Sequence, residues 1–354
     1  MDIDLNLVPE DERKRKPTDP MALTFGSVYS DHMLMMEYRC GQWHRPQIRP
    51  YSHLELSPAA LVLHYGQGIF EGMKAYRRGN RVLLFRPRQN LKRLNRSAKR
   101  MVMPEVDSEQ LLIALTKLID IERDWIPEEH GTSLYIRPTM IAIEPKLGVK
   151  PSDQYLLYVI LSPVGPYFKE GFNPVSIYVS DKYTRAVKGG VGAAKTMSNY
   201  AASLLATKKA TEKGYSQVLW LDAIERKYIE ECGTMNVFVR FEDELATPPL
   251  NDTILPGITR DSVLQLARDF GYDVTERKIS IYEVIEGIAN GKVLEIFGTG
   301  TAAVIAPVGE LYFENTSYQV ADGYVGNLSR KLFDNLTGIQ CGHTDDPYGW
   351  IYEI

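Results

Sequence analysis

The segment Gly189-Gly-Val-Gly-Ala-Ala-Lys-Thr-Met-Ser-Asn-Tyr200 places one lysine, Lys195, after a run of small residues and just ahead of a predicted helix. The small residues leave room for a bulky group beside the amine. An amine that is free to attack an aldehyde is what a Schiff-base lysine requires. Lys195 is therefore a candidate for covalent attachment of an aldehyde cofactor.

A second segment, Tyr228-Ile-Glu-Glu-Cys-Gly-Thr-Met-Asn-Val-Phe238, places two adjacent carboxylates, Glu230 and Glu231, in an otherwise apolar strand. A charge in such a strand is costly unless a cation meets it. A protonated pyridine ring would be such a cation. Lysine and carboxylate together suggest pyridoxal phosphate.

One glycine-rich turn, Gly298-Thr-Gly-Thr-Ala-Ala303, follows a predicted strand and fits the short form of a dinucleotide-binding fingerprint. That fingerprint also requires a helix directly after the glycines. Here the chain continues into the β-like stretch Val304–Val308. A nicotinamide-dependent oxidoreductase is the alternative function from a different class, and this missing helix disfavours it.

A second turn, Leu255-Pro-Gly-Ile-Thr259, precedes a helix predicted over 261–270. Backbone amides and the helix dipole favour an anion at such an N-terminus, where Ile258 and Thr259 lie. Two anion-binding turns without a dinucleotide fold favour a cofactor with a single phosphate.

The bulk composition excludes several classes of protein. The formal net charge of −4 gives no overall basic field for nucleic acid or anionic membranes. No apolar run approaches a membrane span, and the N-terminus has no hydrophobic signal region. Three widely spaced cysteines and six unclustered histidines predict a cytoplasmic protein with no disulfide scaffold and no metal site.

The length of 354 residues suits two domains in which strands and helices alternate. The predicted limits are a flexible N-terminal arm at 1–20, a small domain at 21–164, an interdomain loop at 165–174 and a large domain at 175–354. Helices are predicted at 88–101, 111–121, 200–213 and 261–270, and strands at 82–85, 133–143, 155–161, 175–179, 217–221, 228–240 and 293–297. The first helix is expected to bury one stripe of Leu91, Leu94, Ala98 and Met101, and the helix at 200–213 is expected to be amphipathic.

From Phe25 onward the chain resembles the branched-chain amino acid aminotransferases, in the longer subgroup of the family that includes animal enzymes. The resemblance implies a two-domain α/β (α+β) fold of type IV with the cofactor pyridoxal 5'-phosphate between the domains. It also implies a homodimer that transfers amino groups from L-leucine, L-isoleucine and L-valine to 2-oxoglutarate by ping-pong kinetics. The motifs that carry it are His64-Tyr-Gly, Phe70-Glu-Gly-Met-Lys-Ala, Phe85-Arg-Pro, Arg93-Leu-Asn-Arg-Ser-Ala98, Tyr135-Ile-Arg-Pro138, Leu161-Ser-Pro-Val-Gly-Pro-Tyr-Phe168, Lys195-x-x-x-Asn-Tyr200, Gly233-Thr-Met-Asn236, Leu245-Ala-Thr-Pro-Pro249 and Leu255-Pro-Gly-Ile-Thr-Arg260.

Carried over residue by residue, the resemblance implies that Lys195 forms the internal aldimine and that Glu231, rather than Glu230, pairs with the pyridine nitrogen. Tyr200 would hydrogen-bond the phenolic oxygen of the ring. The remaining cofactor residues would be Arg93, Ile258, Thr259 and Thr301 at the phosphate, with Arg185 nearby, and Thr234.

The substrate-binding residues also follow from the resemblance. Arg137 stands where the family handles the distal carboxylate of glutamate, and Leu147 and Val149 would reach the pocket from a second subunit. The others are Tyr65, Phe70, Tyr135, Tyr167, Thr234, Ala302 and Ala303.

The sequence departs from the family pattern at two places. Ala303-Val-Ile-Ala306 replaces the Cys-x-x-Cys of some members, so no redox regulation through that pair is expected. Thr196-Met-Ser198 replaces the glycines that commonly follow the lysine. Within the same fold, a D-amino-acid aminotransferase or an aminodeoxychorismate lyase is the alternative activity, and a non-catalytic dimeric binding protein is the alternative outside catalysis.

Overall fold

A computed structural model describes residues 2–167 and 172–354, which form two compact units. The first unit comprises Met1–Tyr167, Ala194–Met197 and Gly338–Ile354, and the second comprises Phe168–Ala193 and Ser198–Thr337. Two segments therefore lie outside the predicted limits: the one with Lys195 and the C-terminal tail both belong to the first unit. The predicted interdomain loop at 165–174 falls partly outside the described residues, which omit 168–171.

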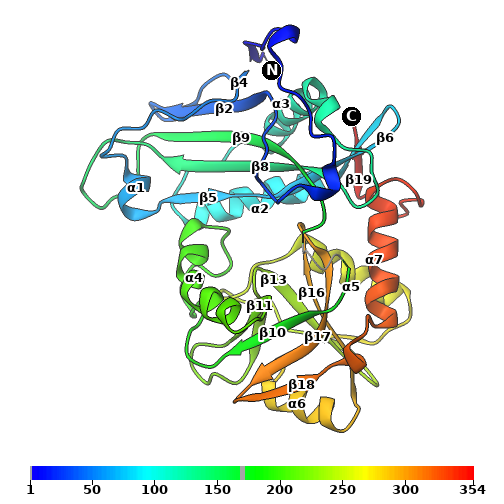
Figure 1. Ribbon diagram of the computed structural model, residues 1–354. Coiled ribbons are helices and arrows are strands. Elements are labelled where there is room, and N and C mark those ends of the chain that lie inside the picture. The colour runs from blue at the N-terminus through cyan, green and yellow to red at the C-terminus, as the bar shows by residue number, and fades with distance from the viewer. Residues whose placement is uncertain (1, 168–171) are drawn as a thin grey trace. The chain divides into compact units, whose positions relative to one another are not determined.

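The first unit contains a ten-stranded sheet with the main order β1-β4-β2-β9-β8-β6-β7-β19 (Figure 1). Its neighbouring strands are antiparallel except for the pair β1 and β4. The C-terminal tail belongs here because β19 pairs with β7. The strands are β1 (Asp4–Leu5), β2 (His32–Arg39), β3 (Gln42–Trp43), β4 (Gln47–Pro50), β5 (Gly68–Phe70), β6 (Met73–Arg78), β7 (Arg81–Phe85), β8 (Ser133–Ala142), β9 (Tyr155–Val164) and β19 (Ile351–Glu353).

Two amphipathic helices, α2 (Pro87–Arg100) and α3 (Ser108–Ile121), share one hydrophobic core with this sheet. Of the stripe that the sequence predicts for α2, Leu91, Leu94 and Ala98 are fully buried, and Met101 is partly buried against the same core. Burying side chains as large as leucine stabilises a fold by roughly 1.5–3 kcal/mol each. Helix α1 (Leu61–Tyr65) is short and ends at Gly66, whose left-handed backbone suits glycine.

Residues 2–20, which the sequence predicts to be a flexible arm, lie against the first unit. Strand β1 pairs with β4, and the backbone N–H of Val8 donates to Nε2 of the buried His32. The backbone N–H of Lys14 donates to Asp31. These buried acceptors hold the segment, and a polar composition with prolines did not reveal them.

The second unit contains a nine-stranded mixed sheet with the main order β12-β11-β10-β17-β16-β13-β14-β15. The strand predicted over 228–240 is two strands, β12 and β13, because the chain turns at Gly233 with a φ of 60°. The strands are β10 (Val175–Ser180), β11 (Gln217–Leu221), β12 (Ile229–Cys232), β13 (Met235–Phe241), β14 (Leu245–Thr247), β15 (Val274–Glu276), β16 (Val293–Gly300), β17 (Val304–Phe313) and β18 (Thr316–Gln319).

The helices of this unit are α5 (Ile258–Asp269), α6 (Ile281–Ala289), most of α4 (Met197–Glu212) and most of α7 (Asn327–Gln340). The helix predicted over 200–213 was expected to be amphipathic, but in α4 Leu204 and Leu205 are 66% and 52% exposed. The remaining short helices are 3-10 turns at Glu10–Glu12, Pro20–Ala22, Arg123–Trp125 and Ala321–Gly323.

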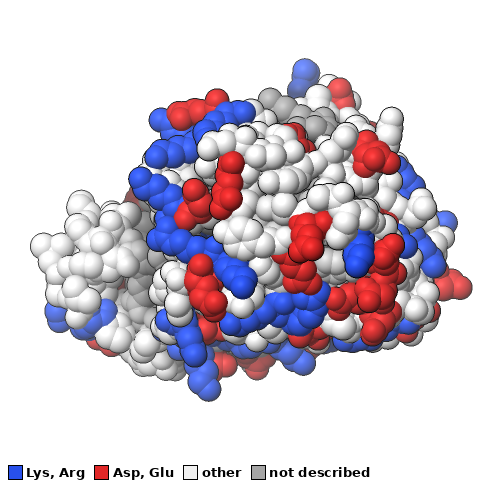
Figure 2. All heavy atoms as spheres, turned by 90° about the horizontal axis from the view of Figure 1, so that it is seen from below, with Lys and Arg blue, Asp and Glu red and all other residues white. Residues whose placement is uncertain are grey.

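The distribution of charged side chains on the surface agrees with the small net charge of the sequence. Figure 2 shows basic side chains interspersed with acidic ones over the face that it presents, without one broad basic field. None of the helices in the described part of the chain is long and apolar enough to cross a membrane.

Candidate active site

Lys195 is held by the first unit through its backbone. Its N–H donates to Ser97 Oγ of α2 at 2.9 Å, and its carbonyl accepts from Phe70 N of β5 at 3.0 Å. The next residue, Thr196, forms an isolated antiparallel β-bridge with Ile69, and its hydroxyl donates to Gly68 O at 2.8 Å. The lysine that the sequence singled out is thus fixed between a helix and a strand, and its Nζ lies 4.9 Å from the centre of the Phe70 ring.

Arg93 is buried and forms a bidentate ion pair with Glu71. Its Nε and Nη2 lie 2.7 and 2.9 Å from the two carboxylate oxygens. Asn90 Nδ2 also donates to Glu71, at 3.0 Å. Burial alone would raise the pKa of Glu71, but the charges of Arg93 and Lys195 and these hydrogen bonds outweigh it, so the pKa is lowered. Glu71 is therefore an anion that fixes the guanidinium of Arg93.

The sequence did not single out Glu71 as a site residue. It lies inside the motif that begins at Phe70, and it is followed by Gly72. A Cβ on Gly72 would meet the hydroxyl of Tyr135 at 1.9 Å. The sequence offers one weak indication that Glu71 is a site residue. It is followed by a glycine and lies 22 residues before Arg93.

Four of the predicted substrate residues meet in the first unit. The Arg137 guanidinium lies 4.8 Å from the Phe70 ring centre and 5.1 Å from that of Tyr135. Its Nη2 donates to the Tyr135 hydroxyl at 3.2 Å. Phe25, which the sequence did not assign, contacts Tyr135 and Tyr167 edge to face at 4.7 and 5.4 Å. Phe25, Phe70, Tyr135 and Tyr167 thus form an aromatic wall, and the Arg137 guanidinium lies against it.

Tyr65, Leu147 and Val149 form a separate, exposed group. The Tyr65 hydroxyl donates to the carbonyl of Leu147. Leu147 and Val149 are 64% and 83% exposed, and Tyr65 is 43% exposed. The structure therefore does not bring Tyr65 into the aromatic wall, because α1 carries it toward the 145–150 loop. The expectation that this loop reaches another subunit stays a prediction.

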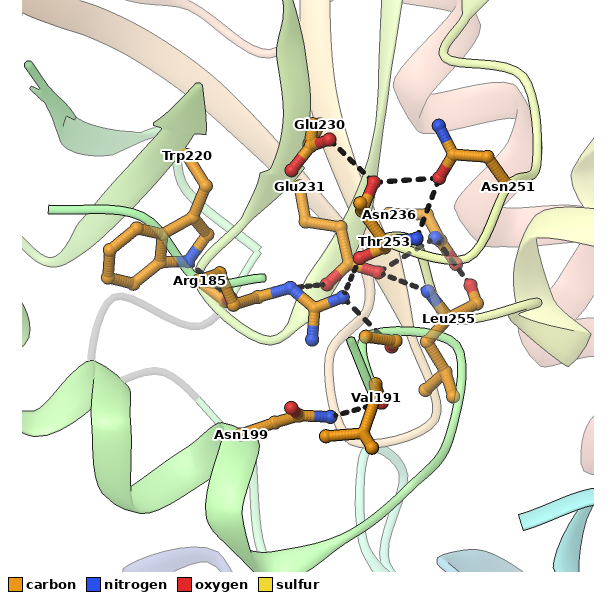
Figure 3. Close-up of polar contacts among 12 residues, drawn as sticks. Arg185, Val191, Asn199, Trp220, Glu230, Glu231, Asn236, Asn251, Thr253 and Leu255 are labelled. Atoms are coloured by element: carbon orange, nitrogen blue, oxygen red, sulfur yellow. Dashed lines mark hydrogen bonds and ion pairs between the residues drawn. The ribbon is translucent and has the colours of Figure 1, made fainter. Parts of the chain in front are cut away.

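Glu231 is the anionic centre of the second unit (Figure 3). Its Oε2 lies 2.7 Å from Arg185 Nε, and both side chains are almost fully buried. Its Oε1 accepts from Leu255 N at 2.9 Å and from Asn236 Nδ2 at 3.4 Å. Arg185 Nη2 donates to the carbonyls of Gly192 and Thr253. The sequence did not indicate that Arg185 pairs with Glu231.

A small hollow of about 10 Å³ lies beside this ion pair. Four predicted cofactor residues line it together with four others. The lining residues are Arg185, Asn199, Tyr200, Ser203, Glu231, Gly233, Thr234 and Leu255.

Cys232 follows Glu231 and is fully buried. Burial and the neighbouring charge of Glu231 raise the pKa of its thiol to about 12. A thiol in that state is not a nucleophile at neutral pH. The chemistry of this strand therefore rests on its carboxyl groups.

The first turn of α5 places Ile258 and Thr259 as the sequence predicts, both buried. Gly257 precedes the helix, and a Cβ there would lie 1.9 Å from Asn236 Oδ1. Asn236 in turn donates to Leu255 O at 2.9 Å. The glycine lets the loop approach the strand that carries Asn236, with the amides of the helix N-terminus beside it.

Thr301, Ala302 and Ala303 form the turn between β16 and β17, which pair as an antiparallel hairpin. No helix follows the glycines at this turn, so the arrangement that a dinucleotide requires is absent from these described residues. The prediction that the chain continues as a strand here, which disfavoured nicotinamide binding, is confirmed.

Comparisons with known proteins agree with this geometry. The family model of class IV aminotransferases ("Amino-transferase class IV") matches residues 68–311. Branched-chain-amino-acid transaminase 1 of Bacillus subtilis (strain 168) is 54% identical over 344 residues, which cover 96% of each chain.

Two solved structures are similar over most of their length. The branched-chain amino acid aminotransferase of Escherichia coli has a TM-score of 0.75 and 29% identity, covering 91% of this chain and 98% of its own. The branched-chain aminotransferase of the archaeon Thermoproteus uzoniensis, solved with norvaline, has a TM-score of 0.75 and 26% identity, covering 91% of this chain and 99% of its own. Class IV aminotransferases depend on pyridoxal phosphate. On this evidence the chain belongs to the class IV aminotransferase family.

Proposed function

We propose that this protein transfers the amino group of L-leucine, L-isoleucine and L-valine to 2-oxoglutarate with pyridoxal 5'-phosphate. The observation that carries the proposal is the buried Glu231 beside a hollow, in a chain 54% identical to a branched-chain-amino-acid transaminase. When bound, this cofactor takes up the electron pair that is left when the α-proton of an amino acid is removed.

The side chains present fit such a cofactor. The second unit offers a buried carboxylate for a protonated pyridine nitrogen, Tyr200 in the lining of the same hollow, and the amides at the start of α5 for a phosphate. The first unit offers Arg93, oriented by Glu71, as a cation for the phosphate. Thr301 supplies a further donor in the β16–β17 turn.

Lys195 is the residue that holds the cofactor and then moves the proton. With the cofactor bound, its Nζ would remove the proton from the α-carbon of the amino acid as general base and would then donate that proton as general acid. The backbone bonds to Ser97 and Phe70 fix where the side chain starts. The charge of Glu71 acts on the same amine from within the first unit.

Glu231 keeps a proton on the pyridine nitrogen. A buried carboxylate favours the protonated ring because a neutral ring would leave the carboxylate charge less compensated. Arg185 shares that carboxylate, and Leu255 N and Asn236 Nδ2 fix its other oxygen. The pair therefore presents an oriented anion and does not depend on side-chain reorganisation during turnover.

The aromatic wall and Arg137 serve the two kinds of substrate. Phe70, Tyr135 and Tyr167 supply apolar surface for a branched side chain. Arg137 supplies the cation for the distal carboxylate of glutamate and 2-oxoglutarate, and its buried Nε has no hydrogen-bond partner among the described residues. The remaining substrate residues of the proposal, all in the second unit, are Thr234, Ala302 and Ala303.

The working form of the proposal is a cytoplasmic homodimer. The exposed Leu147 and Val149, on the loop that the Tyr65 hydroxyl contacts, are the residues that would reach the neighbouring subunit's site. Sedimentation of the purified protein would report the subunit count, and a monomer with full activity would contradict this part.

The first experiment is a visible spectrum of the purified protein before and after L-leucine is added without any oxo acid. The expected result is the absorbance of lysine-bound cofactor and its loss on adding L-leucine. A band that responds only to a D-amino acid would replace the activity with that of a D-amino-acid aminotransferase. No band after pyridoxal phosphate is supplied would overturn the proposal.

A further inference from the structure

Glu230, the neighbour of Glu231 on β12, takes no part in the mechanism above and is 6% exposed. Successive residues of a strand point to opposite faces, so the two carboxyl groups have different surroundings. Glu230 Oε1 lies 2.5 Å from Thr253 Oγ1 (Figure 3). Its contacts decide which protonation state it can have.

Thr253 Oγ1 has a second close neighbour, Asn251 Oδ1, at 2.7 Å. The backbone N–H of Thr253 also donates to Asn251 Oδ1, at 2.9 Å. An amide nitrogen at that position would face this N–H donor, so the atom is the acceptor oxygen. The hydroxyl of Thr253 therefore lies between two oxygens of other side chains.

One hydroxyl has one proton. If Glu230 were ionised, the Thr253 hydroxyl could donate its proton to Glu230 Oε1 or to Asn251 Oδ1, but not to both. The hydroxyl oxygen would then be in close contact with the remaining oxygen without a hydrogen between the two. A protonated Glu230 removes the conflict. It donates to Thr253 Oγ1, and Thr253 then donates to Asn251 Oδ1.

The other oxygen, Glu230 Oε2, is buried and has no hydrogen-bond partner within the part of the chain that the structure describes. An unpartnered oxygen costs far less on a neutral acid than on a carboxylate. The charged groups around Glu230 agree. Burial raises its pKa, as do Asp222 and Asp252, while the bond to Thr253 and the charge of Arg185 lower it without cancelling the rise.

We propose that Glu230 is a neutral carboxylic acid at physiological pH, and that as a hydrogen-bond donor it fixes the 251–255 loop that holds the Arg185–Glu231 pair. It is a positioning residue, since it acts through Thr253. The protonation state follows from this chain's own contacts, and only its effect on the cofactor rests on the proposed function.

The loop connects the two carboxyl groups. Thr253, held by Glu230 at its hydroxyl, accepts from Arg185 Nη2 at its backbone carbonyl, at 2.5 Å. Two residues later, Leu255 N donates to Glu231. A neutral Glu230 thus orders both partners of the ion pair without adding a second negative charge that would compete with Glu231 for Arg185.

The test is infrared difference spectroscopy of the full-length protein at neutral pH, wild type minus Glu230→Gln. The expected difference is the loss of one protonated-carboxyl C=O band that shifts in D2O. Glu231→Gln is the matched control on the adjacent residue, and its spectrum should retain that band. Loss of a carboxylate band in Glu230→Gln, with no acid band, would overturn the proposal.

Thr253→Val gives a second measurement if the first variant folds poorly. The valine keeps the shape but cannot accept, so the acid band should move to higher frequency and remain present. An unmoved band would contradict the contact. Because the Gln amide can donate to Thr253 as the acid does, Glu230→Gln should keep its turnover within about twofold of wild type.

The pH dependence of stability has a definite sign. A carboxyl whose folded-state pKa is raised binds more protons folded than unfolded, so its contribution falls as pH rises from the ordinary value of 4.5 to the folded value. Glu230→Gln lacks this loss, so its stability relative to wild type should improve as pH rises through that range. A relative stability that worsens with rising pH would mean an ionised Glu230. Failure of both tests, with the L-leucine spectrum intact, would sink this inference alone.

Discussion

Arg185 Nε lies 2.7 Å from Glu231 Oε2, with the two side chains only 8% and 4% exposed. A buried pair of this kind is weak evidence for stability, because desolvation offsets much of the attraction. Its value here is orientation. The carboxylate oxygen that faces the guanidinium is fixed, and the hollow beside it is lined by the same two residues.

Replacing Glu231 by Gln removes the charge and keeps the shape. Turnover of L-leucine with 2-oxoglutarate should fall by roughly 10²–10³-fold, as when a preorganised charge-stabilising group is lost. The protein should still bind cofactor, as its visible spectrum would show. Glu242→Gln, at an exposed position, is the control and should leave the rate unchanged. Near-normal turnover in Glu231→Gln would remove this carboxylate from its role.

Replacing Lys195 by Ala should abolish the visible absorbance of lysine-bound cofactor and leave no measurable transamination, because no other amine takes its place as base. Lys188→Ala alters an exposed lysine just before the same glycine-rich segment and should keep both signals. If the spectrum of Lys195→Ala matched wild type, another residue would have to carry the cofactor.

Replacing Glu71 by Gln leaves the buried Arg93 without its anion. The free energy of unfolding should fall by about 3 kcal/mol, the scale for breaking a buried pair from one side. Denaturant titration measures it. Glu109→Gln breaks the exposed pair with Arg88 and should have little effect. Equal effects of the two variants would mean that burial of the first pair is energetically unimportant.

The same pair predicts acid sensitivity. The folded-state pKa of Glu71 is lowered, so the unfolded chain binds more protons between that value and the ordinary 4.5. Stability from this group is present above pH 4.5 and is lost as pH falls through the folded value. Wild type should therefore lose more stability than Glu71→Gln on acidification below pH 4.5. Parallel curves for the two proteins would contradict the lowered pKa.

Replacing Arg137 by Ala should lower kcat/KM for glutamate and 2-oxoglutarate at least about tenfold more than for leucine, because only the former carry a distal carboxylate. Steady-state kinetics with each substrate measure the difference. Arg137→Lys keeps the charge and should recover part of the loss. Equal losses for all substrates would make Arg137 a structural support of the Phe70–Tyr135 wall.

Local patterns predicted most of the elements. The apolar stripe of α2, the strand before it and the helix α5 depend on residues within a few positions, and periodicity and turn chemistry detect such local patterns. The predicted start of α5, at Asp261, was too late, because the helix begins at Ile258. The break at Gly233 was missed because an apolar run conceals a turn that only the backbone of one glycine reveals. The helix over 200–213 was predicted to be amphipathic, yet Leu204 and Leu205 of α4 are both exposed.

The site was predicted less evenly. Lys195 and the adjacent Glu230 and Glu231 are unusual in their local context, so the sequence alone indicated them. The family resemblance selected Glu231 over Glu230 and supplied most of the other residues. Glu71 and Thr253 were missed because their importance lies in contacts with residues 22 or more positions away along the chain. A contact between residues so far apart in the chain produces no regular spacing in the sequence.

The pairing of β19 with β7 has a consequence for how the protein is made. The sheet of the first unit is built mostly from residues before 165, yet one edge of it is closed by Ile351–Glu353. During synthesis the ribosome must produce the entire second unit before that strand emerges. Until then β7 exposes an open edge, and the lysine-bearing segment at 194–197 has also to return to an earlier part of the chain. The N-terminal part therefore cannot finish folding as it leaves the ribosome, and the nascent chain spends most of its synthesis with an unpaired strand edge of the kind that chaperones protect.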